Sequence, residues 1–261
     1  MGILHDDFTS GPNPHWNTSL VGQGTLTVGD ERIARLDVTG ANARHYTNAQ
    51  IDDYQGLTRR RFPWAPSLRL AVRARFSGPA QALRGTAGFG FWNDPFMMTG
   101  VRPPTLPRAL WFFFGSPPSN MKLDLHAPGH GWKAATIDAL RPISLALGTI
   151  ALPAVALMNI RPFYRALWPP IQRAIRVQEA PIEADMAEWH TYEIEWEPAH
   201  THFRVDGTAV LTGAPSPRGP LGFVLWMDNQ SLEITPWGRV RWGLLDIPGE
   251  QWIDVDWIEL A

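Results

Sequence analysis

Three side chains in the first half of the chain, Asp94, Asp124 and His126, could carry acid–base chemistry. Polar and apolar residues alternate over 121–126, so a strand there would place Asp124 and His126 on one face. A histidine that is oriented by a neighbouring carboxylate can act as a general base. The alternative is a solvated strand face on which this histidine has no catalytic role. These three residues are our candidate catalytic set.

Two tryptophans each precede an aspartate by two positions in the sequence. Trp92 lies two positions before Asp94, and Trp226 lies two positions before Asp228, so the members of each pair share one face of a strand. An indole ring presents a flat apolar face on which a ligand ring can stack, and a carboxylate beside it can bind polar groups. Trp92, Trp226 and Asp228 are therefore candidate ligand-binding residues.

Short alternating runs separated by turn residues must position these side chains. The clearest run is 67–76, where apolar residues alternate with arginines, and 188–207 contains two alternating runs that flank Pro198. Asp206-Gly207 is a residue pair typical of a type I′ hairpin turn. The remaining predicted strands are 24–28, 32–38, 87–92, 109–114, 121–126, 222–227 and 252–260. Because repeats and strand–helix alternation are missing, the pattern predicts an all-β, antiparallel two-sheet sandwich.

Several of these runs match, in chain order, the strands of a known enzyme family. Residues 188–207 read EWHTYEIEWEPAHTHFRVDG, 46–51 read YTNAQI, 88–92 read GFGFW and 253–258 read IDVDWI. They resemble strands of glycoside hydrolase family 16, the laminarinase-like family of the concanavalin A-like lectin/glucanase superfamily. Residues 67–76 match another strand of that family in position and pattern. The resemblance implies a single jelly-roll domain over 1–261, in which 121–126 would border 109–114.

The resemblance also implies where an active site would lie. Retaining glycosidases use two carboxylates about 5–5.5 Å apart, and this family carries them on a strand of pattern E-I-D-I-x-E whose alternate residues enter a concave cleft. The corresponding segment here, 108–115, reads RALWFFFG and places Arg108, Leu110 and Phe112 at the acidic positions. A shift of one residue supplies no carboxylate, so we expect the ordinary retaining mechanism to be absent. These three residues and Phe114 are instead expected to line an apolar cleft, unless the strand is a covered core strand.

Residues 134–177 have no counterpart in the family and are predicted to be an apolar, helical insertion. Residues 142–160 carry no charge and approach the length of a membrane span, but flanking strands of one sandwich cannot lie on opposite sides of a membrane. Residues 161–176, RPFYRALWPPIQRAIR, combine arginines with aromatic residues, as helices at a membrane interface do. We expect broken helices that cover the cleft as a lid. Peripheral membrane contact through 142–176 and an oligomer interface are the alternatives.

Composition and charge exclude several classes of protein. The chain of 261 residues has no cysteine, which excludes a disulfide, a thiolate metal site and a cysteine nucleophile. Its formal net charge of −2 provides no field that would attract nucleic acid. The first residues, MGILHDDFTSG, lack the basic and apolar regions of a secretory signal. Either the protein is cytoplasmic or a signal has been removed from it, and we expect a cytoplasmic protein.

A structural calcium ion is the only cofactor that we consider. Members of the superfamily often hold calcium on the convex side through an acidic residue of the last strand. The resemblance thus implies Asp256 as a calcium ligand, with Asp6 or Asp7 close to it. Calcium prefers about six to eight oxygen ligands, of which two carboxylates and nearby carbonyl groups would supply a part.

Three functions are compatible with these patterns. The main interpretation is a non-glycosidase that binds a lipophilic or aromatic small molecule in an apolar cleft, and transforms it if the acid–base candidates are active. It explains the apolar segment 109–114 and the apolar insertion together. The second interpretation is a glycan-binding or glycan-hydrolysing protein with relocated carboxylates, such as Asp94, Asp124 or Asp228, and the 13 tryptophans favour it because indole rings stack on sugars. The third is a membrane-peripheral structural protein.

Overall fold

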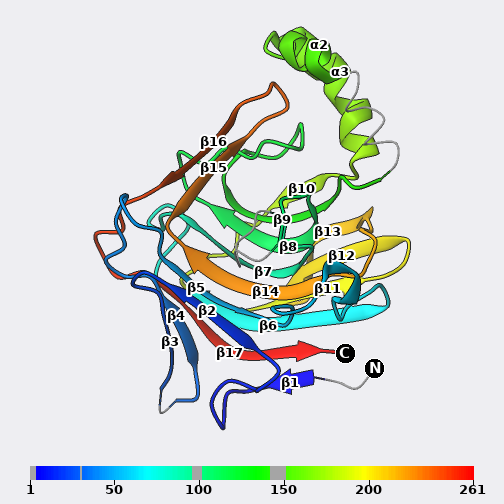
Figure 1. Cartoon of the computed structure of the whole chain (residues 1–261). Helices are drawn as coiled ribbons and strands as arrows, with labels where there is room; N and C mark the ends of the chain where they lie inside the picture. Colours follow the sequence, from blue (N-terminus) through cyan, green and yellow to red (C-terminus); the bar gives the residue numbers. More distant parts are fainter. Residues whose placement is uncertain (1–3, 30, 96–101, 142–150) are drawn as a thin grey trace.

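Two antiparallel β-sheets packed face to face form most of the described structure, which is a computed structural model of residues 4–29, 31–95, 102–141 and 151–261 (Figure 1). The strands of the first sheet are, in spatial order, β13 (Thr208–Pro215), β12 (His200–Val205), β11 (His190–Trp196), β6 (Leu68–Phe76), β17 (Trp252–Leu260), β4 (Ala34–Asp37) and β3 (Thr25–Val28), and β1 (Leu4–Asp6) also pairs with β17. Those of the second sheet are β10 (Gln178–Pro181), β9 (Gly131–Asp138), β8 (Arg108–Gly115), β7 (Thr86–Trp92), β14 (Gly222–Asp228), β5 (Asn48–Asp52) and β2 (Asn17–Val21). The predicted antiparallel jelly roll is confirmed.

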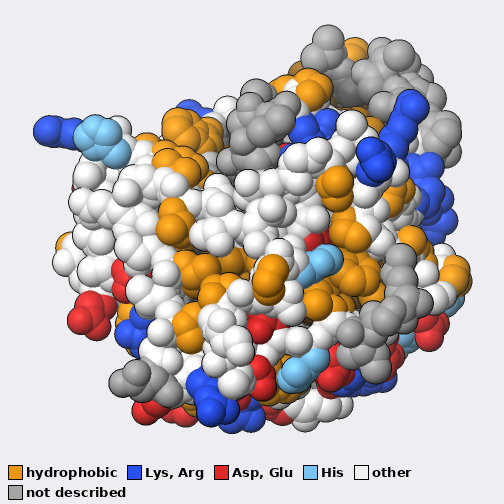
Figure 2. Space-filling model, turned by 60° about the horizontal axis from the view of Figure 1, so that its bottom comes forward, with side chains coloured by type: hydrophobic (Ala, Val, Ile, Leu, Met, Phe, Trp, Pro, Cys, Tyr) orange, Lys and Arg blue, Asp and Glu red, His pale blue; other side chains and the backbone are white. Residues whose placement is uncertain are grey.

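Strand β6 shows how alternation builds the first sheet. Its apolar residues are buried, and its arginines form ion pairs on the other face: Arg69 with Glu193 and Glu259, Arg73 with Asp256, and Arg75 with Asp254. Basic and acidic side chains are accordingly interspersed over the lower part of the face in Figure 2. The turn between β12 and β13 has positive φ at Asp206 (50°) and Gly207 (74°), as a type I′ turn requires. The predicted hairpin is thus confirmed.

The main core lies between the two sheets and includes one face of β8. The ring of Phe112 lies 5.2 Å from that of Tyr192 and 5.3 Å from that of Phe203, centroid to centroid, on strands of the opposite sheet. Leu110, Phe112 and Phe114 are at most 1% exposed. The prediction that these three residues line a cleft is therefore wrong. Both faces of β8 are apolar, so the period of two could not tell which face meets the other sheet.

The segment 121–126 is a loop and not the predicted strand. The amide of Met121 donates to the carbonyl oxygen of Gly129 over 2.6 Å, and Lys122 Nζ donates to the carbonyl oxygen of Ala127 over 2.7 Å. These local hydrogen bonds close the loop on itself, and the place beside β8 is taken by β9. Alternation was misleading here because a short polar–apolar pattern also suits a loop that packs one side against the sandwich.

The connection from β9 to β10 contains helices α2 (Ala151–Leu157) and α3 (Arg161–Ala174), so the predicted insertion is helical. Residues 134–138 belong to β9, while 142–150 lie outside the described residues. Pro162 occupies the first turn of α3, where its missing N–H costs nothing. No described helix is long and apolar enough to cross a membrane. Peripheral membrane contact through 142–176 stays a prediction.

The hairpin of β15 (Gln230–Ile234) and β16 (Val240–Leu244) rises on the same side of the second sheet as the two helices (Figure 1). The rings of Tyr164 in α3 and Trp237 at the hairpin tip meet edge to face, with centroids 5.3 Å apart. Asn159 Nδ2 donates to the carbonyl oxygen of Trp237 over 3.2 Å, and Trp168 Nε1 donates to that of Leu123 over 2.7 Å. These contacts join the helices both to the hairpin and to the sandwich.

Candidate functional site

The candidate site lies on the outer face of the second sheet, by which we mean the face turned away from the first sheet. Residues that pair across neighbouring strands point to the same side. One row across this face consists of Trp226, Gly88, Phe113 and Lys133. The next row consists of Val224, Gly90, Trp111, Ala135 and Glu179, and a third contains Trp92, Ala109 and Ile137. The outer face of β8 therefore carries Ala109, Trp111 and Phe113, none of which is acidic.

Four aromatic rings form a cluster on the outer face. Trp92 and Trp226 are stacked, with ring centroids 6.0 Å apart and 3° between their planes. Trp111 lies 5.9 Å from Trp92 and 5.6 Å from Trp226, and Phe113 lies 5.3 Å from Trp111. A Cβ atom at Gly88 would lie 3.0 Å from Cη2 of Trp226 and nearer still to the backbone of β8, so only glycine fits there. We call these four rings the aromatic cluster.

A first cavity of about 330 Å³ lies against the aromatic cluster. Its polar lining consists of Thr86, Asp228 and Gln230, and its other wall residues include Met121 and Trp242. Trp242 is 61% exposed and stands at the rim. The cavity therefore combines flat apolar surfaces with a few polar atoms, which is the usual composition of a binding site for an organic ligand.

Asp228 is the carboxyl group of the first cavity. Its Oδ1 accepts hydrogen bonds from the amide and hydroxyl of Thr86 and from the amide of Gln230, and Oδ2 accepts one from Gln230 Nε2 over 2.8 Å. Burial nevertheless raises the pKa of Asp228 to about 6, because removing the charged form from water outweighs the donated hydrogen bonds. The structure thus places Asp228 and Trp226 together as predicted from their spacing.

A second cavity, of about 490 Å³, adjoins the first and shares Trp111 and Met121 with it. Its floor is the outer face of β8, β9 and β10, and its walls include Val155 of α2, Trp168 of α3 and Ile234 of β15. The two cavities together form a long depression beneath the helices and the hairpin. Most of its lining is apolar, and Glu179 is the carboxyl group among the lining residues.

A buried ion pair borders the second cavity. Lys133 Nζ lies 3.0 Å from Glu179 Oε1, and the two side chains are 1% and 4% exposed. Lys133 also donates to the carbonyl oxygens of Met121 and Pro128. Asp124 Oδ2 accepts hydrogen bonds from Gln172 Nε2 (2.9 Å) and from the amide of Glu179 (3.3 Å). Sequence reasoning missed Lys133 and Glu179 because it did not recognise β9 and β10 as strands.

The candidate catalytic residues lie in three different settings. Asp124 Oδ1 accepts a hydrogen bond from the backbone amide of His126, whose side chain is exposed. Asp94 forms an ion pair with Arg102 over 2.9 Å, and both side chains are buried. Arg108, predicted to line a cleft, pairs with the buried Asp138 on the face of β8 opposite the aromatic cluster. A catalytic role for Asp94, Asp124 and His126 stays a prediction.

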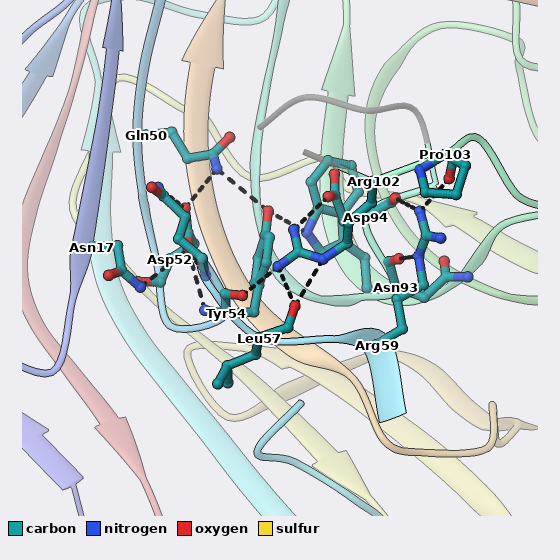
Figure 3. Close-up of polar contacts among 12 residues, drawn as sticks. Asn17, Gln50, Asp52, Tyr54, Leu57, Arg59, Asn93, Asp94, Arg102 and Pro103 are labelled. Carbon is teal, nitrogen blue, oxygen red and sulfur yellow. Dashed lines mark hydrogen bonds and ion pairs between the residues drawn. The ribbon is translucent and has the colours of Figure 1, made fainter. Parts of the chain in front are cut away.

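Asp94 and Arg102 belong to a polar network that holds one end of the aromatic cluster (Figure 3). Arg102 donates to Asp94 and to the carbonyl oxygens of Tyr54 and Leu57. The Tyr54 hydroxyl in turn accepts a hydrogen bond from Trp92 Nε1 over 2.8 Å and one from Gln50 Nε2 over 3.3 Å. The network fixes the orientation of the Trp92 indole. The contacts of Arg102 are explained by its position behind Tyr54, which holds Trp92 in place.

The acidic residues expected to hold calcium make other contacts in the structure. Asp256 is paired with Arg73 over 3.1 Å, and each side chain is 43% exposed. Asp6 accepts hydrogen bonds from the amides of Phe8 and Asn13 and from the Trp16 indole. Among the described residues, no group of three or more His, Cys, Asp or Glu side chains could hold a metal ion. A structural calcium ion stays a prediction.

Comparisons with known proteins agree with the observed fold. The family model described as "Glycosyl hydrolases family 16" matches residues 173–232, which extend from the end of α3 into β15. The resemblance to glycoside hydrolase family 16 is confirmed. No curated protein matches the chain. Neither face of β8 carries a carboxylate, because Ala109, Trp111 and Phe113 lie on the outer face and Leu110, Phe112 and Phe114 lie in the core.

The chain is similar to the solved structures of two glycan-degrading enzymes and of a pseudo-glucanase. An endo-acting O-glycanase of the human gut microbiota has a TM-score of 0.55 at 14% identity, over 99% of this chain and 98% of that chain. A lichenase from a mouse hindgut metagenome has a TM-score of 0.53 at 12% identity, over 100% and 99%. A pseudo β-1,3-glucanase and immunostimulatory antigen of Mycobacterium tuberculosis has a TM-score of 0.54 at 12% identity, over 98% and 97%. At such identities the likeness establishes the fold.

These findings overturn the main functional interpretation of the sequence. A binder of a lipophilic or aromatic small molecule was inferred from Leu110, Phe112 and Phe114, which lie in the core between the sheets. The family match and the structural neighbours instead favour the alternative, a glycan-directed protein. The interpretation as a small-molecule binder is therefore wrong.

Proposed function

We propose that the chain binds a glycan along the outer face of its second sheet and does not cleave it by the retaining mechanism of the family. The observation that carries this proposal is the aromatic cluster, in which Trp92, Trp111 and Trp226 lie against two adjoining cavities. The apolar face of a pyranose ring packs on an indole ring, and a long depression suits a chain of sugars better than one compact molecule. The similar structures, which include glycanases and a pseudo-glucanase, support the same ligand class.

The carboxyl groups of the depression argue against hydrolysis by a relocated pair formed from Asp228 and Glu179. These residues lie on β14 and β10, which are separated by β7, β8 and β9. Four inter-strand spacings of about 4.8 Å place the two strands about 19 Å apart. Retaining and inverting glycosidases need carboxyl groups about 5–9.5 Å apart. Asp228 and Glu179 therefore cannot act on one glycosidic bond.

Glycan binding in the first cavity is tested most cleanly at Trp242. This residue is 61% exposed at the rim of the first cavity, so its removal leaves no hole in the core. We expect the wild-type protein to bind oligosaccharides from laminarin, lichenan or mucin O-glycans in titration calorimetry. Trp242→Ala should weaken the tightest of these interactions at least tenfold, or by about 1.4 kcal/mol, without lowering the melting temperature.

Trp189→Ala provides a matched control, because Trp189 lies beside Arg75 of the first sheet and far from the aromatic cluster. Its affinity for the same oligosaccharides should equal that of the wild type. The proposal fails if the wild-type protein binds none of the oligosaccharides, or if Trp242→Ala and Trp189→Ala weaken binding equally.

A further inference from the structure

One carboxyl group in the depression has a buried oxygen without a hydrogen-bond partner among the described residues. Glu179 on β10 pairs in register with Ala135 of β9, which places its side chain on the outer face. The side chain lines the second cavity together with Trp111 and Trp168, yet it is only 4% exposed. Oε1 accepts a hydrogen bond from Lys133, whereas Oε2 has no hydrogen-bond partner among the described residues.

The ion pair with Lys133 accounts for the position of Oε1 of Glu179 but not for that of Oε2. Lys133 ties the loop that contains Met121 and Pro128 to β9, and it needs a counter-charge because it is 1% exposed. Oε1 meets that need. A second carboxylate oxygen that is buried without a donor destabilises the folded state, so its position against a cavity calls for another explanation.

Neighbouring groups point to a ligand with hydroxyl groups. The Tyr164 hydroxyl of α3 is likewise buried without a partner among the described residues, and the charges of Asp124 and Glu179 add to the effect of burial in raising its pKa. Burial also raises the pKa of Glu179; Lys133 and the backbone of Asp124 oppose this rise, and the charge of the Asp124 carboxylate reinforces it. A carboxylate oxygen accepts a hydrogen bond, and a sugar hydroxyl can donate one.

We propose that Glu179 is a specificity-determining residue whose Oε2 accepts a hydrogen bond from a hydroxyl group of a sugar unit in the second cavity. The sugar ring lies against the indole rings of Trp111 and Trp168, and its hydroxyl replaces the donor that the fold does not supply. This inference rests on the proposed glycan-binding function and adds a polar contact that fixes which sugar, and which orientation, the cavity accepts.

Glu179→Gln tests the inference, because the amide oxygen can still accept from Lys133 while the acceptor at Oε2 becomes a donor. Affinity is measured by calorimetry with the oligosaccharides from laminarin, lichenan and mucin O-glycans, and with monodeoxy analogues of the tightest one. We expect Glu179→Gln to weaken binding of that oligosaccharide at least tenfold. The wild type should bind one deoxy analogue at least tenfold more weakly than the parent oligosaccharide. The Glu179→Gln variant should bind that analogue and the parent with equal affinity. Glu193→Gln, on the first sheet, is the matched control and should bind as the wild type does.

A variant that removes the whole ion pair separates ligand binding from a structural role. Lys133→Met with Glu179→Met replaces both charges by apolar side chains of similar size, a change that folded proteins often tolerate. It should lose affinity as Glu179→Gln does. The proposed role of Glu179 is wrong if either variant binds the oligosaccharide with wild-type affinity. The proposed function still holds in that case if Trp242→Ala binds the oligosaccharide more weakly than the wild type does. Absence of any binding by the wild-type protein overturns both.

Discussion

At the scale of the residue, burial dominates the chemistry of the candidate site. Thr86 and Gln230 donate hydrogen bonds to Asp228 and favour its charged form, yet the pKa of this carboxyl is raised to about 6. Desolvation is therefore the larger effect. The same effect raises the pKa of Glu179, where the charge of Lys133 opposes it. Both groups need more free energy to ionise than a carboxyl group in water.

The raised pKa of Asp228 predicts a pH dependence of stability. Between its unfolded pKa of 3.8 and its folded pKa of about 6, the folded state holds the proton more tightly, so stability falls as the pH rises through this window. A shift of about two units corresponds to a loss on the order of 3 kcal/mol. Asp228→Asn should remove this loss, so urea unfolding at pH 4.5 and pH 7 should show a smaller difference in the variant than in the wild type. Equal differences in the two proteins would contradict the prediction.

At the scale of the element, the contact between α3 and the β15–β16 hairpin closes one side of the depression. The rings of Tyr164 and Trp237 meet edge to face at 5.3 Å, and Asn159 adds a hydrogen bond to the hairpin backbone. The helices and the hairpin are otherwise anchored at different places on the sandwich. The lid predicted from the sequence would separate from the hairpin at this contact.

The coupling between these two elements can be measured directly. In a double-mutant cycle with Tyr164→Ala and Trp237→Ala, we expect an interaction energy of about 0.5–1.5 kcal/mol, the range for such aromatic pairs. Hydrogen exchange in α3 should also become faster in Trp237→Ala. Pairing Trp237→Ala with Phe163→Ala, a neighbouring residue that is 43% exposed, should give additive effects. Additivity in the first pair would show that the ring contact does not join the elements.

At the scale of the whole molecule, the fold is similar to that of glycoside hydrolase family 16. Strand β8, which the sequence matches to the family's catalytic strand, is apolar on both faces. Ala109, Trp111 and Phe113 occupy the outer face of β8, and the carboxyl groups of the depression lie on other strands. Glycoside hydrolysis needs a paired acid and base or nucleophile at a fixed separation. A scaffold without such a pair can still bind a glycan, as we propose for this chain.

Because neither face of β8 carries a carboxylate, we predict that the protein does not hydrolyse the substrates of the family. We expect no release of reducing ends from laminarin, lichenan, agarose or carrageenan over a day at micromolar protein, in an assay where an active laminarinase gives full conversion. Asp124 and Glu179 are neighbours, since the Glu179 amide donates to Asp124. Turnover that disappears in both Asp124→Asn and Glu179→Gln would show that the carboxylates have moved to this place and that the prediction is wrong.

The class of fold and several of its details could be predicted from local sequence patterns. Alternation in β6, the Asp206-Gly207 pair and the ordered strand motifs predicted an antiparallel jelly roll and its hairpin. These features are local, because strand period and turn chemistry are set by a few consecutive residues. The helical character of the connection between β9 and β10 was predicted for the same reason. The family resemblance was carried by the same local motifs.

Which face of each strand lies in the core and which lies at the site depends on packing between distant parts of the chain. Both faces of β8 are apolar, so the face of Leu110 and Phe112 could not be distinguished from that of Trp111 and Phe113 until the opposite sheet was in place. Glu179 was missed because its partner Lys133 is 46 positions away in the sequence. Local periodicity fixes which residues share a side, whereas long-range packing decides whether that side becomes core or site.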